Sequence, residues 1–278
     1  MASTKEIQNR IKSIKDTMKI TNAMYMISSS KLKKAKKDLE NTEPYFYTLQ
    51  VSLARLLRHL PDMDHLYFEN EDDEKKENPK RGYIVVTADK GMAGAYNNNI
   101  IKIAEEELAN HPDSELYVVG QVGRHYFARK NVPVDIHFQY TAQNPSLHRA
   151  RVIADKMLEN YESGKIDEVY IIYTKMINSV TAEPEMIQLL PFRKMDFKIS
   201  QADVYHEEII IEPSPRAVMD RIVPNYITGF IYGALVESFC SEQNSRMMAM
   251  DSATRSAKDM LADLSIKYNR ARQAAITQ

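Results

Sequence analysis

A glycine-rich segment is the part of this 278-residue chain that comes nearest to a site for chemistry. Gly91 and Gly94 follow an apolar run at 82–87 and precede a helical pattern. The backbone amides of such a strand-to-helix turn can bind phosphate. The segment is neither G-x-G-x-x-G nor a P-loop, because the Lys-Ser/Thr pair of a P-loop is absent. We therefore favour a tight structural turn, and a nucleotide-binding α/β enzyme stays as an alternative.

Other catalytic or metal-binding patterns are missing from the sequence. The seven histidines have no metal-ligand spacing, and the single cysteine, Cys240, cannot form a thiolate cluster. No G-x-S-x-G motif is present. Glu105, Glu106 and Glu107 are adjacent, so on a helix they fan apart instead of converging as an acid/base pair. We expect no catalytic residues, no cofactor and no metal.

The elements around the turn alternate between strands and helices. Short apolar runs predict strands, and helical patterns separate the first four of these runs, which are 82–87, 115–119, 132–138, 168–173 and 185–190. This alternation predicts a doubly wound, mostly parallel, Rossmann-like α/β domain over 81–208. The last strand is expected to be antiparallel, because its connection is too short for a crossover helix. An acidic linker at 61–80 precedes the domain.

The last part of the chain, 216–278, is predicted to form one very long helix. Its apolar or small residues recur at alternating steps of four and three, the period of a coiled-coil seam, at Gly229, Gly233, Val236, Cys240, Gln243, Met247, Met250, Thr254, Ala257, Leu261, Leu264, Tyr268, Ala271 and Ala275. Such a helix would be about 95 Å long, about three times the width of a small domain. It is too long to be covered by its own domain, so it needs a long partner helix or an enclosing protein.

The N-terminal stretch has the same period. Ser3 and Glu6 form a capping-box pattern, and the seam then continues at Ile7, Ile11, Ile14, Met18, Thr21, Tyr25, Ser28, Leu32, Ala35 and Leu39. The two terminal helices are therefore predicted to pair as a long antiparallel coiled coil, made of the segments 1–60 and 209–278. Because the N-terminal helix is the shorter one, much of the C-terminal helix is expected to be left for other proteins.

The N-terminal helix has three unusual features. Thr21 and Ser28 are polar seam residues, where Leu or Ile would be usual. A second apolar stripe lies beside the seam, at Ile20, Met24 and Ile27. This stripe indicates either a second partner surface or a helix that is buried on two sides. Pro44 is expected to end or kink the helix.

Charge and hydropathy limit the class of protein. The net charge of −1 argues against a general nucleic-acid binder, although residues 31–37 contain five lysines. These lysines are either a solvated face or a docking surface for an acidic partner, so a coiled-coil adaptor protein is a second alternative. No apolar run has the length of a membrane span, and the polar N-terminus is not a signal peptide. A single cysteine fits a reducing compartment.

Several motifs together resemble the γ subunits of F-type ATP synthases, of the bacterial type. They are 5–15 (KEIQNRIKSIK), 19–24 (KITNAM), 87–97 (TADKGMAGAYN), 237–239 (ESF), 246–251 (RMMAMD) and 268–278 (YNRARQAAITQ). Because these motifs extend from one end of the chain to the other, they are more specific together than any of them is alone.

The resemblance implies the central-stalk rotor subunit of that enzyme. Its paired terminal helices would stand inside the ring of three α and three β subunits. Its α/β domain would bind the ε subunit and the membrane c-ring, in a complex that also contains δ. Ion-driven rotation would change the conformation of the β-subunit catalytic sites, while this chain would have no catalytic residues. Without a transit peptide, we expect a bacterial protein, held peripherally at the cytoplasmic face of the plasma membrane.

The resemblance also implies partner contacts for particular residues. A contact with the β-subunit catch region is implied for Met24, Arg272, Gln273 and Thr277. A contact with acidic β-subunit loops is implied for Lys31, Lys33 and Lys34. A foot on the c-ring and ε is implied for Ile209, Ile211 and Glu212, where the match is looser because the local sequence differs.

Overall fold

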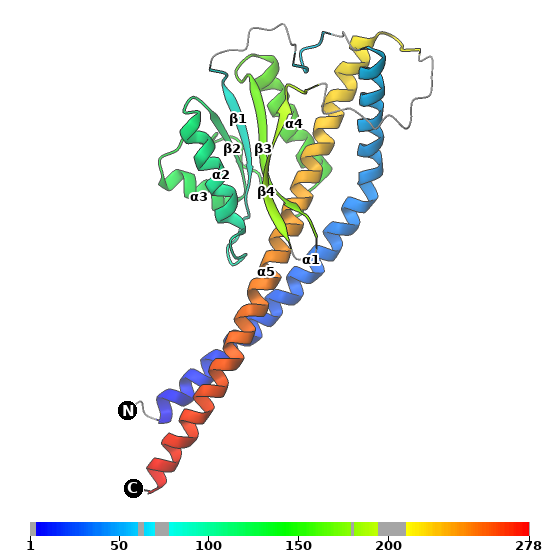
Figure 1. The fold of residues 1–278 in the computed structure, drawn as a ribbon. Helices are drawn as coiled ribbons and strands as arrows, with labels where there is room; N and C mark the ends of the chain where they lie inside the picture. Colours follow the sequence, from blue (N-terminus) through cyan, green and yellow to red (C-terminus); the bar gives the residue numbers. More distant parts are fainter. Residues whose placement is uncertain (1–3, 61–63, 70–77, 179–180, 194–209, 278) are drawn as a thin grey trace.

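Two long helices run antiparallel along the molecule and dominate its shape (Figure 1). The computed structural model describes residues 4–60, 64–69, 78–178, 181–193 and 210–277. Helix α1 spans Thr4–His59 and helix α5 spans Pro215–Thr277. Both termini lie at the same end, where the two helices extend beyond the rest of the molecule. The predicted antiparallel coiled coil is therefore confirmed.

The seam of the coiled coil follows the predicted spacing closely. The polar seam residues Thr21 and Ser28 are buried, as are Met250, Thr254 and Ala257 of α5. Among the predicted seam residues whose burial the structure describes, one is wrong. Tyr25 is exposed, and its neighbour Met24 is partly buried instead. From Thr21, a step of three residues leads to Met24 and a step of four leads to Tyr25, and the spacing alone does not decide between them. The step of three places Met24 toward α5.

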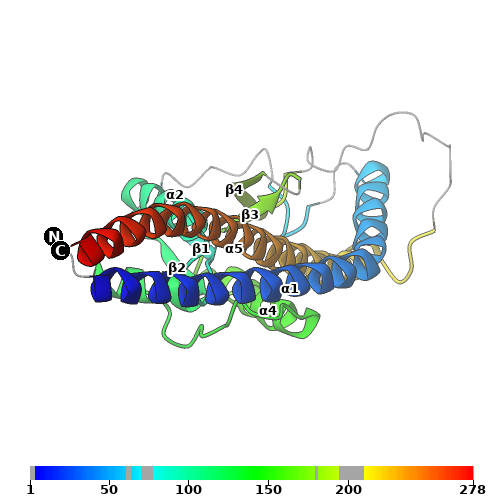
Figure 2. The same cartoon turned by 90° about the horizontal axis from the view of Figure 1, so that it is seen from below.

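Pro44 does not end the first helix. It lies inside α1, which continues to His59. Figure 2 shows that the last part of α1 turns away from the line of its first part, as expected for a proline that removes one backbone hydrogen bond. The turned part contributes buried apolar side chains to the main core, at Leu53, Ala54, Leu56 and Leu57. Tertiary burial therefore holds the helix together past its proline.

The described residues form a four-stranded sheet with the order β2-β1-β3-β4. Its strands are β1 (Arg81–Val86), β2 (Glu115–Val119), β3 (Glu168–Met176) and β4 (Ala182–Leu190). Strands β1, β2 and β3 are parallel, and β4 pairs with β3 in the antiparallel direction. The predicted mostly parallel sheet and its antiparallel last strand are both confirmed.

The strand predicted at 132–138 is wrong. This segment is irregular: its Asp135 N–H donates to the Leu116 carbonyl of β2 at 3.1 Å, and a single bridge joins Val119 to Tyr140 just beyond the segment. Pro133 has no N–H for a ladder, and the Asp135 carboxylate accepts a hydrogen bond from the His137 N–H at 2.8 Å. Both residues therefore favour a turn over a strand.

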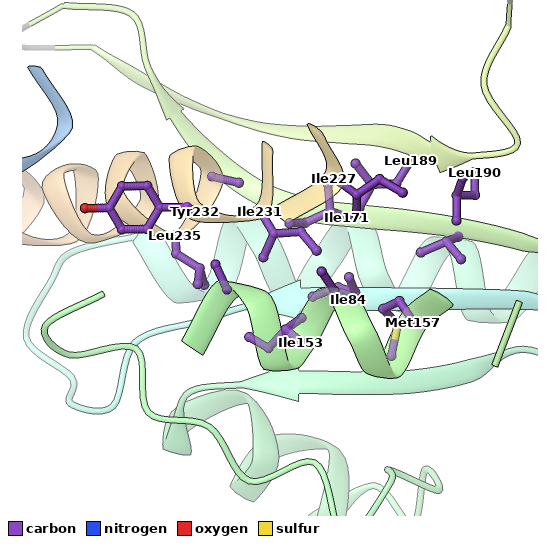
Figure 3. Close-up of a cluster of buried hydrophobic side chains, with 14 of the residues drawn as sticks. Ile84, Ile153, Met157, Ile171, Leu189, Leu190, Ile227, Ile231, Tyr232 and Leu235 are labelled. Carbon is purple, nitrogen blue, oxygen red and sulfur yellow. The ribbon is translucent and has the colours of Figure 1, made fainter. Parts of the chain in front are cut away.

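Helices cover both faces of the sheet. Helices α2 (Tyr96–Asn110) and α3 (Gln121–Arg129) pack on one face, over Tyr83, Val85 and Ile172. Helix α4 (Leu147–Glu162) and the first half of α5 pack on the other face. Figure 3 shows Ile153 and Met157 of α4 and Ile227 and Ile231 of α5 in one cluster with the strand residue Ile171.

The position of α5 in this core corrects one expectation from the sequence. Much of the helix was expected to be left for other proteins. Instead, its first half is an inner element of the α/β domain, because apolar residues surround the helix there rather than lining one seam. They include Met219, Val223, Ile227, Ile231, Leu235 and Phe239. The part with one buried stripe is limited to the end beyond the domain.

Candidate functional site

The glycine-rich turn after β1 is held in place by hydrogen bonds from the protein's own groups. The Asp89 carboxylate accepts a hydrogen bond from the Gln121 N–H, the first residue of α3, at 3.1 Å. It also accepts hydrogen bonds from the Thr141 hydroxyl, the Ala142 N–H at 3.0 Å and the Gln143 N–H at 3.1 Å. A helix N-terminus of this kind attracts an anion, and here that anion is a side chain of the protein. A phosphate at the turn would be repelled by Asp89.

Neighbouring residues hold the same turn from the other side. The Thr87 hydroxyl donates to the Val119 carbonyl at 2.9 Å and accepts from the Gly123 N–H at 3.0 Å. A Cβ at Gly120 would lie 2.2 Å from the Thr87 carbonyl oxygen, so only glycine allows this close approach. These contacts support the prediction of a structural turn over that of a nucleotide site.

The turn is also joined to the long helix α5. Arg246 of α5 lies within 2.6 Å of a Glu242 carboxylate oxygen, and its Nη2 donates to the carbonyl oxygens of Lys90 and Gly91 at 3.2 Å each. The two charged side chains are 8% and 2% exposed, so both are buried. Burial raises the pKa of the Glu242 carboxyl, and the positive charge of Arg246 opposes that rise.

A cavity of about 210 Å³ lies where the coiled coil meets this turn. Residues of α1, the turn, one loop and α5 line it: Met24, Ile27, Ser28, Lys31, Lys90, Gly91, Met92, Gln143, Gln243 and Arg246. Two of the predicted partner residues, Met24 and Lys31, are therefore found at the base of the projecting coil. Lys31 is partly buried and close enough for its charge to favour the ionised form of Glu242.

The remaining predicted residues lie elsewhere. Lys33 and Lys34 are exposed on α1, near Lys31 in sequence. Arg272 and Gln273 are exposed near the far end of α5, and Thr277 is its last residue. Because Thr21 contacts Thr254 across the seam, Met24 is level with about residue 251 of α5. Met24 and Arg272 are therefore separated by about 32 Å along the helix, and they do not form one site within the chain.

The predicted foot lies at the opposite end, where α5 begins. Ile209 falls outside the described residues. Ile211 is partly buried against the main core, Glu212 is exposed, and Ile210, which precedes them, is 88% exposed. The structure therefore places one strongly exposed apolar side chain at the end of the molecule away from the termini.

A second cavity, of about 390 Å³, lies beside the first turns of α5. Its lining is formed by His65, Leu66, Tyr67, Glu162, Arg216, Asp220 and Pro224. The His65 Nε2 is 3.1 Å from an Asp220 carboxylate oxygen, and the Tyr67 hydroxyl donates to Glu162 at 2.5 Å. Burial, together with the Glu162 carboxylate, raises the pKa of Tyr67. These contacts fasten the segment after α1 to α4 and α5.

Sequence reasoning missed the polar contacts between distant elements. Thr21 and Thr254 share a hydrogen bond of 2.8 Å between their hydroxyl oxygens, and the Thr21 hydroxyl donates to the Met18 carbonyl at 3.1 Å. The Glu242–Arg246 pair had one sequence signal, the i,i+4 spacing of opposite charges within a stretch of small and apolar residues. In the described part of the chain, no group of three or more His, Cys, Asp or Glu side chains is arranged to hold a metal ion.

The fold and these contacts define a class of protein. A long antiparallel coiled coil projects from an α/β domain, and its helix α5 is built into the core of that domain. Such a protein can transmit movement from one end to the other. Among the described helices, none is long and apolar enough to cross a membrane.

Comparisons with known proteins agree with this class. A family model described as ATP synthase matches residues 3–278. The ATP synthase gamma chain of Ruminiclostridium cellulolyticum is 44% identical, over 99% of this chain and 94% of that protein. The gamma chain of Acetivibrio thermocellus is 45% identical, over 100% of this chain and 96% of that protein. The central stalk and c-ring structure of the Tetrahymena thermophila mitochondrial ATP synthase has a similar fold, with a TM-score of 0.63 at 24% identity, covering 84% of this chain and 99% of that one.

The chain belongs to the family of ATP synthase gamma chains. The resemblance found in the sequence is therefore confirmed, and so is the function expected from it, that of the central-stalk rotor subunit. The partner contacts of individual residues stay predictions.

Proposed function

We propose that this chain couples rotation to ATP synthesis by mechanical means alone, with no catalytic residues or cofactor of its own. The observation that carries the proposal is the projecting end of the coiled coil. Over 251–274 of α5, the residues that are buried or partly buried are Asp251 and those of the seam, and the other side chains are exposed. The same holds for most of the facing part of α1. An exposed, elongated surface around one buried seam is suited to many similar contacts during rotation.

In this proposal, the projecting coil stands inside the ring of α and β subunits and meets β at two heights. Arg272, Gln273 and Thr277 would contact the β catch region near the tip. Met24 and the three lysines Lys31, Lys33 and Lys34 would contact β at the base of the projection, with the lysines facing acidic loops. The separation of about 32 Å along the helix supports two sets of contacts rather than one.

The opposite end of the molecule would bind the c-ring and ε. The exposed Ile210 and Glu212, with the neighbouring Ile209 and Ile211, would form the foot. The complex would then hold this chain at the cytoplasmic face of the plasma membrane, peripherally.

A reversible crosslink tests the mechanical role. Lys33→Cys at the base and Gln273→Cys at the tip would each be paired with a cysteine on the nearby β surface in the assembled enzyme. The native Cys240 needs no replacement, because it is only 2% exposed. We call the coiled coil of α1 and α5 the shaft. We expect the disulfide at position 33 to stop ATP synthesis, since the crosslinked shaft cannot turn against β, and a reductant to restore synthesis.

The crosslink at position 273 is the less decisive of the two tests, because local unwinding of the last turns of α5 would allow the rest of the shaft to rotate. The control carries Lys33→Cys without the β cysteine. If the enzyme that is crosslinked at position 33 makes ATP at the rate of its reduced form, the mechanical role is wrong.

A further inference from the structure

The buried ion pair Glu242–Arg246 joins the shaft to the α/β domain. Apolar side chains at this point would pack without the free-energy cost of removing two charges from water. Burying two charges is expensive unless hydrogen bonds satisfy them. Here the guanidinium contacts Glu242 on its own helix and two backbone carbonyls, Lys90 and Gly91, on the turn after β1. One side chain of α5 therefore holds the backbone of the domain.

The turn that Arg246 holds is itself firmly connected to the domain. Asp89, next to Lys90, accepts hydrogen bonds from α3 and from the loop at 141–143. On the other side of it, the Ala88 N–H donates to the Asn97 side chain of α2 at 2.8 Å. A force on Arg246 therefore passes to β1, α2 and α3 together.

Two further hydrogen bonds join α5 to the sheet, about one to two turns before Arg246. The Thr174 N–H of β3 donates to the Ser238 hydroxyl at 3.0 Å, and the Ser241 hydroxyl donates to the Thr174 carbonyl at 3.3 Å. The residues at 238, 241 and 246 follow one another along the side of α5 that faces the domain. The interdigitated side chains of the apolar core already resist a rotation of α5 about its own axis. Hydrogen bonds depend on direction, so these contacts add to that resistance and favour one angle of the helix.

We propose that Arg246 is a positioning residue for energy coupling: it fixes the rotational angle of the shaft relative to the α/β domain, so that torque applied to the domain reaches the coil. The role rests on the mechanical function proposed above. Ser238 and Ser241 fix the same angle at a second level of α5.

Single-molecule rotation of the assembled catalytic sector measures this angle. The α and β subunits are fixed to a surface, and a bead is attached to the domain at Lys102→Cys, whose side chain is 78% exposed on α2. The test variant combines Arg246→Met with Glu242→Gln, which removes both charges without leaving a buried carboxylate unpaired. We expect a broader distribution of bead angles during each pause, and an unchanged rate of unloaded ATP hydrolysis.

Hydrogen exchange of the same complexes gives a second readout. The amides of 88–94 should exchange about tenfold faster or more in the double variant, which is the factor expected for the loss of hydrogen bonds to a charged group. Arg246→Lys keeps the charge but has one donor nitrogen in place of the planar guanidinium, so its angular distribution should fall between those of the wild type and the double variant.

The same helix provides a matched control. Asp251 and Arg255 form an i,i+4 ion pair at 2.5 Å on the surface of α5, where the Arg255 side chain is 77% exposed and the Asp251 side chain 45%. Arg255→Met with Asp251→Asn should leave the angular distribution and the exchange at 88–94 unchanged. The proposal is overturned if the assembled Arg246→Met/Glu242→Gln enzyme matches the wild type in both readouts, or if the control pair broadens the distribution equally. These outcomes are independent of the crosslinking test, which uses the wild-type residues at 242 and 246.

Discussion

Two glycines one helical turn apart on α5 should respond in opposite directions to the same substitution. Gly229 and Gly233 both lie in the helix and on its predicted seam. A Cβ at Gly229 would be 1.9 Å from Cδ1 of Phe46 and 2.6 Å from its Cγ, whereas a Cβ at Gly233 meets nothing within 4 Å. Gly229 is therefore a point of close approach between α1 and α5, and Gly233 is not.

The size of each effect follows from two contributions. Replacing glycine by alanine inside a helix stabilises the folded state by about 0.5–1 kcal/mol, because the unfolded chain loses conformational freedom. Gly233→Ala should show that gain alone. Gly229→Ala has the same gain but must displace the ring of Phe46, which packs 6.2 Å from the ring of Tyr232. Overpacking of this kind costs about 1–3 kcal/mol, so the net effect is a loss of up to about 2.5 kcal/mol.

Thermal unfolding of the full chain, followed by far-UV circular dichroism, measures the difference. For a chain of this size, a difference of about 2 kcal/mol between the two variants corresponds to several degrees in Tm. Phe46→Leu should remove part of the penalty in the Gly229→Ala background. Equal shifts of the same sign for Gly229→Ala and Gly233→Ala would show that the helices do not approach each other at Gly229.

Two further predictions concern buried polar groups of the same helices. The effects of Thr21→Val and Thr254→Val on the free energy of unfolding should be coupled by about 1 kcal/mol in a double-mutant cycle measured by denaturant unfolding. Each single variant leaves one hydroxyl without its partner across the seam, so the double variant should be at least as stable as either single one. Strictly additive single effects would contradict this prediction. Burial raises the pKa of the Cys240 thiol from 9.0 to about 11, so the folded state keeps the thiol neutral while the unfolded state ionises. The stability from this group is complete below pH 9 and is lost as the pH rises toward 11, so the wild type should lose about 1.4 kcal/mol more than Cys240→Ala between pH 8 and pH 10. Equal losses for the two proteins in urea titrations would refute the assignment.

Elements with a strong period could be predicted from the sequence. The four-three spacing of small and apolar residues identified both long helices, and continuous apolar runs identified the four strands of the sheet. The error at 132–138 arose because a run with Val132, Val134 and Ile136 has strand-like side chains. Its backbone preferences, set by Pro133 and Asp135, favour a turn.

The contacts that build the site could not be read from the sequence in the same way. Arg246 meets Lys90 and Gly91 from more than 150 positions away, and it does so through their backbone carbonyls. Any residue type can supply a backbone carbonyl, so the side-chain types at 90 and 91 do not indicate this contact. The hydrogen bond from the Gln121 N–H, at the N-terminus of α3, to the Asp89 carboxylate could not be predicted either, because the two residues are 32 positions apart and the donor is a backbone group.

The distribution of burial along α5 divides the shaft into two mechanical parts. Between Met219 and Met250 the helix is enclosed by α1, α4 and the sheet, with hydrogen bonds at Ser238, Ser241 and Arg246 that fix its angle. Beyond Met250 the burial is largely limited to one seam, which begins with the hydrogen-bonded Thr254. A seam of this kind supplies less apolar burial than a leucine seam, so the projecting coil is the less stable part. It is also the part that the proposed function places inside the ring, where contacts with other subunits can support it. Rigidity is therefore built into the chain where torque enters, and it is left to the partners where the shaft turns.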